Sequence, residues 1–218
     1  MEKYDLLLFD LDGTLTDSKL GIVNSVKYAL EKLGLDALND NDLVKFVGPP
    51  LRNSFKEFCG MDDAGAEDAV AKYREYYFDK GMFENLVYSG VADMLGELAK
   101  QGTTLAVATS KPEILAVQIL KHFGLEHYFS LIVGSEMDGA RSDKAEIITA
   151  VRDVLDKDRN KRVVMIGDRK HDILGAKACD VDSVGVLWGY GGLEELQAAG
   201  ADSIVSTPRE LLKTLNHE

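Results

Sequence analysis

The sequence predicts an α/β fold, namely a Rossmann-like parallel sheet with helices on both faces, interrupted by an inserted all-helical module. Two observations predict it. Short, nearly continuous apolar runs alternate with segments of helical period along most of the chain, and one long region contains helical segments only. Alternating strands and helices form parallel sheets, whose strands are apolar on both sides because helices cover both faces.

The apolar runs predict five buried strands. In chain order they span residues 4–9, 103–109, 130–134, 162–168 and 181–189. Helical segments between them span residues 91–100, 112–123 and 144–155. Pro112 suits the first turn of its helix, while Gly102 and Gly124 suit the ends of the helices that precede them. A sheet of this kind places its functional sites beyond the carboxyl ends of the strands.

One region breaks the alternation of strand and helix. Between residues 18 and 83 only helical stretches occur, at 20–33, 40–47, 51–59 and 66–79. We therefore expect residues 1–16 and 85–218 to form a catalytic core and residues 17–84 to form a helical cap packed over the strand ends. Asp17 or Ser18 is expected to cap the first helix of that module.

Composition excludes several classes of protein. The 218 residues are 45% hydrophobic and 28% charged, which is typical of a globular chain. No apolar run approaches the ~20 residues of a membrane span, and the first residues lack a signal-peptide pattern, so we expect a cytoplasmic protein. A net charge of -12 disfavours nucleic acid polymers and anionic membranes as partners, but not a small phosphorylated metabolite. A monomer is the default expectation, with a homodimer left open.

Two carboxylates close the first apolar strand, in the stretch LLLFDLDGTLT of residues 6–16. Because that strand belongs to the sheet, Asp10 and Asp12 lie at its carboxyl end. Gly13 then permits a tight turn, so that both side chains can project into a cleft. An Asp-Gly pair is also an ordinary turn signal, and a solvated turn is the competing interpretation.

Polar residues also close other strands. Thr109 and Ser110 end the run LAVATS, and Asp168 ends VVMIGD. Asp172 follows Asp168 by one helical turn, and Lys144 opens the helix after another strand. Four carboxylates in one dry cleft would repel each other strongly without a cation. Mg²⁺ prefers oxygen ligands and is commonly held by a few carboxylates and a substrate phosphate, so the pattern indicates phosphoryl transfer.

With these motifs in place, the chain resembles the haloacid dehalogenase superfamily, in its phosphatase branch with a helical cap. The matching segments are DLDGTL, VATSK, RSDKAEII and GDRKHD, in the family's order and across almost the whole chain. The segment that begins at GDRKHD most closely resembles phosphoglycolate phosphatase and 5′-nucleotidase-like members. The resemblance implies a Mg²⁺-dependent hydrolase of small phosphate monoesters.

The resemblance also implies a role for each motif residue. Asp10 would be the nucleophile that forms an aspartyl-phosphate, and Asp12 the general acid and then the general base. Thr109, with Ser110 beside it, would hold the transferring phosphoryl group, while Lys144 offsets the charge on that group and on Asp10.

The implied metal site uses some of the same positions. Asp168 would bind Mg²⁺ directly. Asp172 would orient the ligands around the metal, either as a direct ligand itself or from the second layer. Asp10 and the backbone carbonyl of Asp12 would complete the protein ligands.

Three cationic residues stand beside these motifs. Arg52, in VGPPLRNSF, follows a turn that resembles a cap signature of related phosphatases, and it is our candidate for a substrate contact. Lys111 and Arg169 adjoin the core motifs and could steer anions, but surface salt bridges would explain either one equally well.

Other functions remain open at this point. A phosphomutase of the β-phosphoglucomutase type would share the motifs and differ mainly in how its cap excludes water. From another class, a receiver-like phosphoacceptor module also combines a phosphorylated aspartate with a hydroxyl, a lysine and Mg²⁺. The chain length, the helical insertion and GDRKHD argue against a receiver, and Asp12 argues against a dehalogenase.

Overall fold

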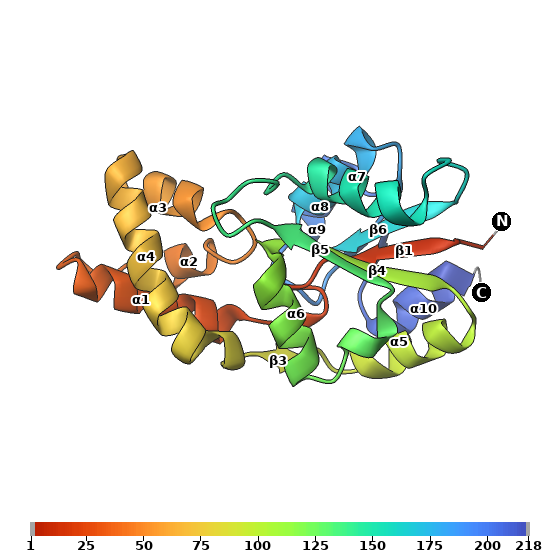
Figure 1. Cartoon of the computed structure of the whole chain (residues 1–218), viewed down its shortest axis with the longest axis horizontal. Helices are drawn as coiled ribbons and strands as arrows, with labels where there is room; N and C mark the ends of the chain where they lie inside the picture. The colour runs from red at the N-terminus through yellow and green to blue at the C-terminus, as the bar shows by residue number, and fades with distance from the viewer. Residues whose placement is uncertain (1–2, 217–218) are drawn as a thin grey trace. The chain divides into compact units, whose positions relative to one another are not determined.

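A computed structural model describes residues 3–216 (Figure 1). The described chain forms two compact units. The first unit comprises the residues up to Thr16 and from Val87 onward, and the second comprises Asp17–Leu86.

The first unit contains a parallel six-stranded sheet in the order β5-β4-β1-β6-β7-β8. This confirms the predicted fold class and all five predicted strands. The strands are β1 (Leu6–Phe9), β4 (Thr104–Pro112), β5 (Leu131–Ser135), β6 (Val163–Gly167), β7 (Asp182–Val186) and β8 (Ser203–Val205). The edge strand β8 was not predicted, because three residues are too few to show a strand pattern.

Helices cover both faces of this sheet (Figure 1). They are α5 (Val91–Lys100), α6 (Glu113–His122), α7 (Lys144–Leu155), α8 (Lys170–Ala178), α9 (Leu193–Ala199) and α10 (Pro208–Asn216), with a short 3₁₀ helix at Glu126–Tyr128. The four residues of β1 are all buried, and Leu6 and Leu8 pack in one cluster with Ile147 and Ile148 of α7. Burial on both faces is the physical reason why β1 reads as a continuous apolar run.

Two expectations about helix ends are settled by the structure. Gly102 and Gly124 both have positive φ angles, +74° and +66°, and each directly follows the C-cap residue of the helix that it was expected to end. Pro112 was placed wrongly: it is the last residue of β4 and the N-cap of α6, so it precedes the first turn instead of forming it.

The second unit is built from helices. It contains α1 (Lys19–Lys32), α2 (Asp40–Val44), α3 (Leu51–Cys59), α4 (Asp63–Asp79) and a 3₁₀ helix at Gly81–Phe83. A two-stranded ribbon of β2 (Thr16–Asp17) and β3 (Leu86–Val87) lies where the chain passes between the units. Ser18 is the N-cap of α1, but the side chain that accepts a backbone N–H there belongs to Asp17, from Lys19 at 3.2 Å.

Two further observations concern residues 3–216. Both Cys59 and Cys179 are free thiols. No helix in this range is long and apolar enough to cross a bilayer.

Candidate active site

The predicted carboxylates lie at the carboxyl ends of neighbouring strands. Asp10 and Asp12 follow β1, and Asp168 follows β6, which pairs with β1 in register from Leu6 to Phe9. Because parallel strands end at the same edge of a sheet, Asp10 and Asp168 meet there. Asp172 joins them from the first turn of α8. All four side chains are buried.

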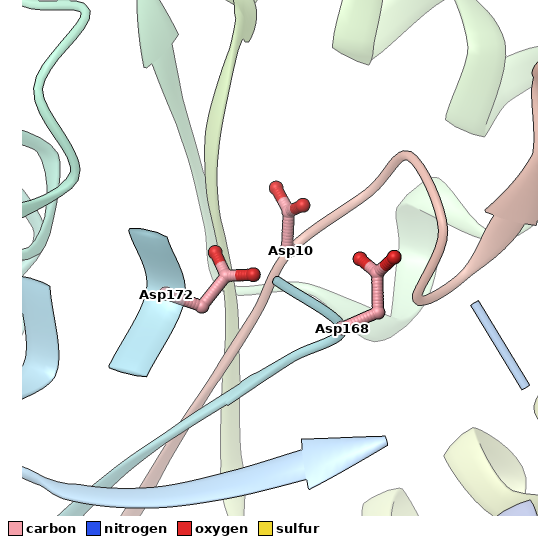
Figure 2. Close-up of side chains that lie close together, drawn as sticks. All are labelled: Asp10, Asp168 and Asp172. Atoms are coloured by element: carbon pink, nitrogen blue, oxygen red, sulfur yellow. The ribbon is translucent and has the colours of Figure 1, made fainter. Parts of the chain in front are cut away.

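Three of these carboxylates form a cluster (Figure 2). Carboxylate oxygens of Asp10, Asp168 and Asp172 lie within 4.8 Å of one another. Burial raises the pKa of Asp168 well above its ordinary value, and the charges of Asp172 and Asp10 raise it further. Burial and Asp10 also raise the pKa of Asp172, although Lys144 opposes them. Bringing three carboxylates together therefore has an electrostatic cost that a bound cation would remove.

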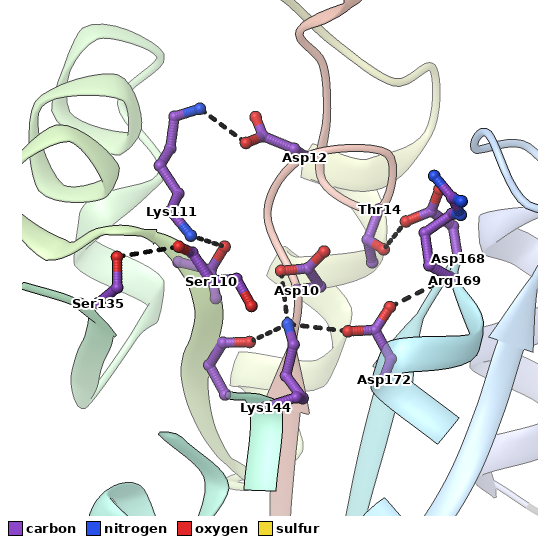
Figure 3. Close-up of polar contacts among 12 residues, drawn as sticks. Asp10, Asp12, Thr14, Ser110, Lys111, Ser135, Lys144, Asp168, Arg169 and Asp172 are labelled. Carbon is purple, nitrogen blue, oxygen red and sulfur yellow. Dashed lines mark hydrogen bonds and ion pairs between the residues drawn. The ribbon is translucent and has the colours of Figure 1, made fainter. Parts of the chain in front are cut away.

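Lys144 supplies positive charge inside the cluster (Figure 3). Its Nζ lies 2.9 Å from Asp10 Oδ1 and 2.8 Å from Asp172 Oδ1, and it donates to the Ala108 carbonyl at 2.9 Å. Burial alone would lower the pKa of Lys144, but the two carboxylates outweigh it and raise the pKa above its ordinary value. Lys144 is thus held as a fully charged ammonium between the two acids.

Asp168 and Asp172 are also fixed by hydrogen bonds. Asp168 accepts from the Thr14 hydroxyl at 3.3 Å and from the backbone N–H of Tyr190 at 2.7 Å. Asp172 accepts from the backbone N–H of Arg169 at 3.1 Å, as part of a capping box at the start of α8. Oxygen donors that are buried, close together and oriented in this way fit the ligand preference of Mg²⁺.

Glycines leave the space that the carboxylates occupy. A Cβ on Gly13 or Gly189 would collide with the carboxylate of Asp168, and a Cβ on Gly167 would collide with that of Asp172. Gly13 also has a φ of +89°, which L side chains rarely adopt. The cluster therefore depends on these close backbone approaches as much as on the acids themselves.

Gly13→Ala should lower activity at least about tenfold, because it displaces Asp168 as well as straining the backbone. The check is the rate of phosphate release together with denaturant unfolding. Gly124→Ala is the matched control, because Gly124 also has a positive φ, +66°, but nothing lies within 4 Å of its Cβ position. A Gly13→Ala enzyme as active as the Gly124→Ala enzyme would contradict the assigned role of this turn.

Asp12 stands apart from the cluster and has its own cation. Its Oδ2 lies 2.6 Å from Lys111 Nζ, and the two side chains are only 11% and 6% exposed. The residues around position 111 offer no reason to prefer this buried pair over a surface salt bridge for Lys111. Thr14 was also missed, because its contact with Asp168 spans most of the chain. Only their places in DLDGTL and VATSK could have drawn attention to them.

The remaining candidates occupy different settings. Thr109 is buried on β4, and its hydroxyl accepts from the backbone N–H of Lys111 at 3.3 Å. The Ser110 hydroxyl donates to the Ser142 carbonyl at 3.0 Å. Arg169 pairs with Glu195 at 2.9 Å. Arg52 lies in the helical unit, half exposed, paired with Glu67 at 3.0 Å and Asp63 at 3.5 Å.

Magnesium should stabilise the protein more at about pH 8 than at about pH 5. Without metal, the pKa of Asp168 is higher in the folded protein than in the unfolded chain, so the protonated carboxyl contributes to stability. This contribution is present below the pKa of the unfolded chain, near 3.8, and is lost as pH rises through the pKa of the folded protein. A divalent cation held by this cluster would bind the ionised carboxylate, so a proton would compete with it at low pH. Thermal unfolding with magnesium and with chelator measures this difference, and an equal magnesium effect at both pH values would contradict the assignment.

Comparison with known protein families identifies the class of protein to which this fold and site belong. The model of the haloacid dehalogenase-like hydrolase family matches residues 7–186, and the chain belongs to this family. Within the family it is a phosphatase, a hydrolase of phosphoric monoesters, as the resemblance of its motifs predicted.

Similar proteins cover nearly the whole chain. A 5′-nucleotidase from Pseudomonas aeruginosa is 44% identical over 90% of this chain and 88% of its own. Tyrosine-protein kinase PtkA from Mycobacterium tuberculosis is 40% identical over 87% of this chain, which corresponds to 64% of PtkA. The crystal structure of a predicted phosphatase from Clostridium acetobutylicum has a TM-score of 0.93 and 45% identity, and covers 100% of both chains.

Proposed function

We propose that the protein is a Mg²⁺-dependent phosphatase that hydrolyses small phosphate monoesters, nucleoside 5′-monophosphates or phosphoglycolate, through an aspartyl-phosphate intermediate. The observation that carries the proposal is the buried cluster in which Lys144 bridges Asp10 and Asp172, with Asp168 beside them. One nucleophilic carboxylate, one fixed ammonium and a set of oxygen ligands are the parts that phosphoryl transfer requires.

In the first step, a carboxylate oxygen of Asp10 attacks phosphorus and forms the new P–O bond. The bond between phosphorus and the ester oxygen breaks, and Asp12 gives its proton to that departing oxygen. The Thr109 hydroxyl binds the phosphoryl oxygens. Lys144 balances the charge that develops on the phosphoryl group and on Asp10.

In the second step, a water molecule attacks the phosphorus of the aspartyl-phosphate. Asp12, now ionised, takes the proton of that water, and the P–O bond to Asp10 breaks. Inorganic phosphate leaves, and Asp10 and Asp12 return to their starting states. The use of one residue as acid and then as base requires its carboxyl group to stay close to the same reaction path in both steps.

The metal ligands in this proposal are Asp10, Asp168, Asp172 and the backbone carbonyl of Asp12. When bound, Mg²⁺ would supply the positive charge that draws electron density from the phosphoryl oxygens. The residues of this chain hold that site together through the hydrogen bonds to Asp168 and Asp172.

The relatives and the motifs guide the choice of substrate. Similarity to a protein named 5′-nucleotidase supports nucleoside 5′-monophosphates, and the resemblance of the GDRKHD segment also supports phosphoglycolate. We assign the helical unit the role of a specificity cap, with Arg52 as its substrate contact. The enzyme would act in the cytoplasm on a small phosphorylated metabolite, as a monomer or a homodimer.

The experiment is phosphate release from a panel of nucleotides, phosphoglycolate, sugar phosphates and an aryl phosphate, with magnesium or with chelator. Magnesium-dependent release, ranked by kcat/KM, would establish the activity and the substrate class. An arm with ATP and a tyrosine-containing peptide tests the function named for PtkA. Transfer to tyrosine without release of phosphate from any ester would overturn the proposal.

A further inference from the structure

The ion pair between Lys111 and Asp12 is more enclosed than the surface pairs of this chain. Lys111 Nζ is 2.6 Å from Asp12 Oδ2, and both side chains are nearly buried. The other oxygen, Asp12 Oδ1, is also buried and accepts no hydrogen bond from any described residue. One oxygen of the proposed acid and base is therefore held by an ammonium, while the second has no hydrogen-bond partner among the described residues.

A bulge in β4 places Lys111 at this point. Ala108 pairs with Val133 and Pro112 with Ser135, so that residues 109–111 all lie opposite Gly134. The bulge needs that glycine, because a Cβ on Gly134 would collide with the backbone of Lys111 and Glu113. Bulges of this kind re-aim side chains next to active sites.

Hydrogen bonds fix the shape of the bulge, and Figure 3 shows the one between Ser135 and Ser110. The Ser135 hydroxyl donates to the Ser110 carbonyl at 2.9 Å, and the Ser110 hydroxyl donates to the Ser142 carbonyl at 3.0 Å. Lys111 therefore follows a residue, Ser110, that is held by two hydrogen bonds, which lowers the entropy lost when its ammonium group engages Asp12.

The two buried ammonium groups contact different acids. Lys144 contacts Asp10 and Asp172, whereas Lys111 contacts Asp12. We propose that Lys111 is a positioning residue for Asp12, holding Oδ2 so that Oδ1 exchanges the proton with the leaving oxygen and then with water. The inference rests on the proposed function and adds to it a residue that acts through Asp12, not on the phosphoryl group.

A double-mutant cycle tests the inference. The value of kcat/KM for an alkyl phosphate, whose leaving oxygen has to receive a proton, is measured for wild type, Lys111→Met, Asp12→Asn and the double variant. Lys111→Met should lower kcat/KM at least about tenfold in the wild-type background and less than about twofold in the Asp12→Asn background. Equal losses in both backgrounds would overturn the inference.

Two further measurements keep the test decisive. Lys121→Met, which removes an exposed lysine of α6, should leave kcat/KM unchanged. If Lys111→Met does not fold, Lys111→Gln takes its place in the same cycle with the same two outcomes. Failure of the proposed function is distinguishable: wild type would then release no phosphate from any ester, whereas equal losses in an active enzyme contradict only the role of Lys111.

Discussion

Replacing Asp10 with asparagine should abolish turnover, by about a thousandfold or more in kcat. The carboxamide keeps the size of the side chain but lacks the anionic oxygen that, in the proposed mechanism, attacks phosphorus. It also loses the ion pair with Lys144, which lies 2.9 Å from Asp10 Oδ1. Steady-state phosphate release with magnesium measures the loss.

The fold should survive this substitution, because one of the crowded carboxylates is neutralised. Lys144 retains Asp172 as a partner at 2.8 Å. Asp158→Asn changes an exposed aspartate in the same unit and serves as the control. An Asp10→Asn enzyme with the activity of the control would show that Asp10 is not the nucleophile.

Replacing Lys144 with methionine should lower the free energy of unfolding by about 3–5 kcal/mol in the absence of metal. Methionine fills similar space but leaves the buried carboxylates of Asp10 and Asp172 without their ammonium partner. Activity should also be lost, because nothing then offsets the charge on Asp10 during transfer. Denaturant unfolding with chelator present measures the change in stability.

Two comparisons separate this charge effect from loss of packing. The destabilisation should shrink at acid pH, where the unpaired carboxyls can take up protons. It should also shrink when Asp172→Asn is added, because fewer buried charges remain unpaired. Lys100→Met, at an exposed site on α5, should change stability little. A destabilisation independent of both pH and Asp172→Asn would contradict the electrostatic explanation.

The positions of the main acids could be predicted because they follow from topology. An apolar run marks a buried parallel strand, and the residues that follow such strands share one edge of the sheet. That rule places Asp10, Asp12 and Asp168 near one another before any contact is known. The helix that begins at Lys144 was predicted with its observed bounds, because its apolar residues have a clear helical period.

The ion pair between Lys111 and Asp12 could not be predicted in the same way. It depends on a bulge in β4, which depends in turn on a glycine in the neighbouring strand. No local pattern around residue 111 contains that information. Similarly, β2 and β3 have only two residues each, too few for any periodicity to appear.

In the proposed mechanism, Asp10 becomes covalently phosphorylated during turnover. Acid quenching of the enzyme mixed with its best ester and magnesium, followed by mass spectrometry of the peptides, tests it most directly. We predict the added mass of one phosphoryl group on the peptide that contains Asp10, absent without magnesium and absent in Asp10→Asn. Full turnover by an enzyme that never carries this mass at any quench time, even when hydrolysis is slowed by Asp12→Asn, would contradict the account.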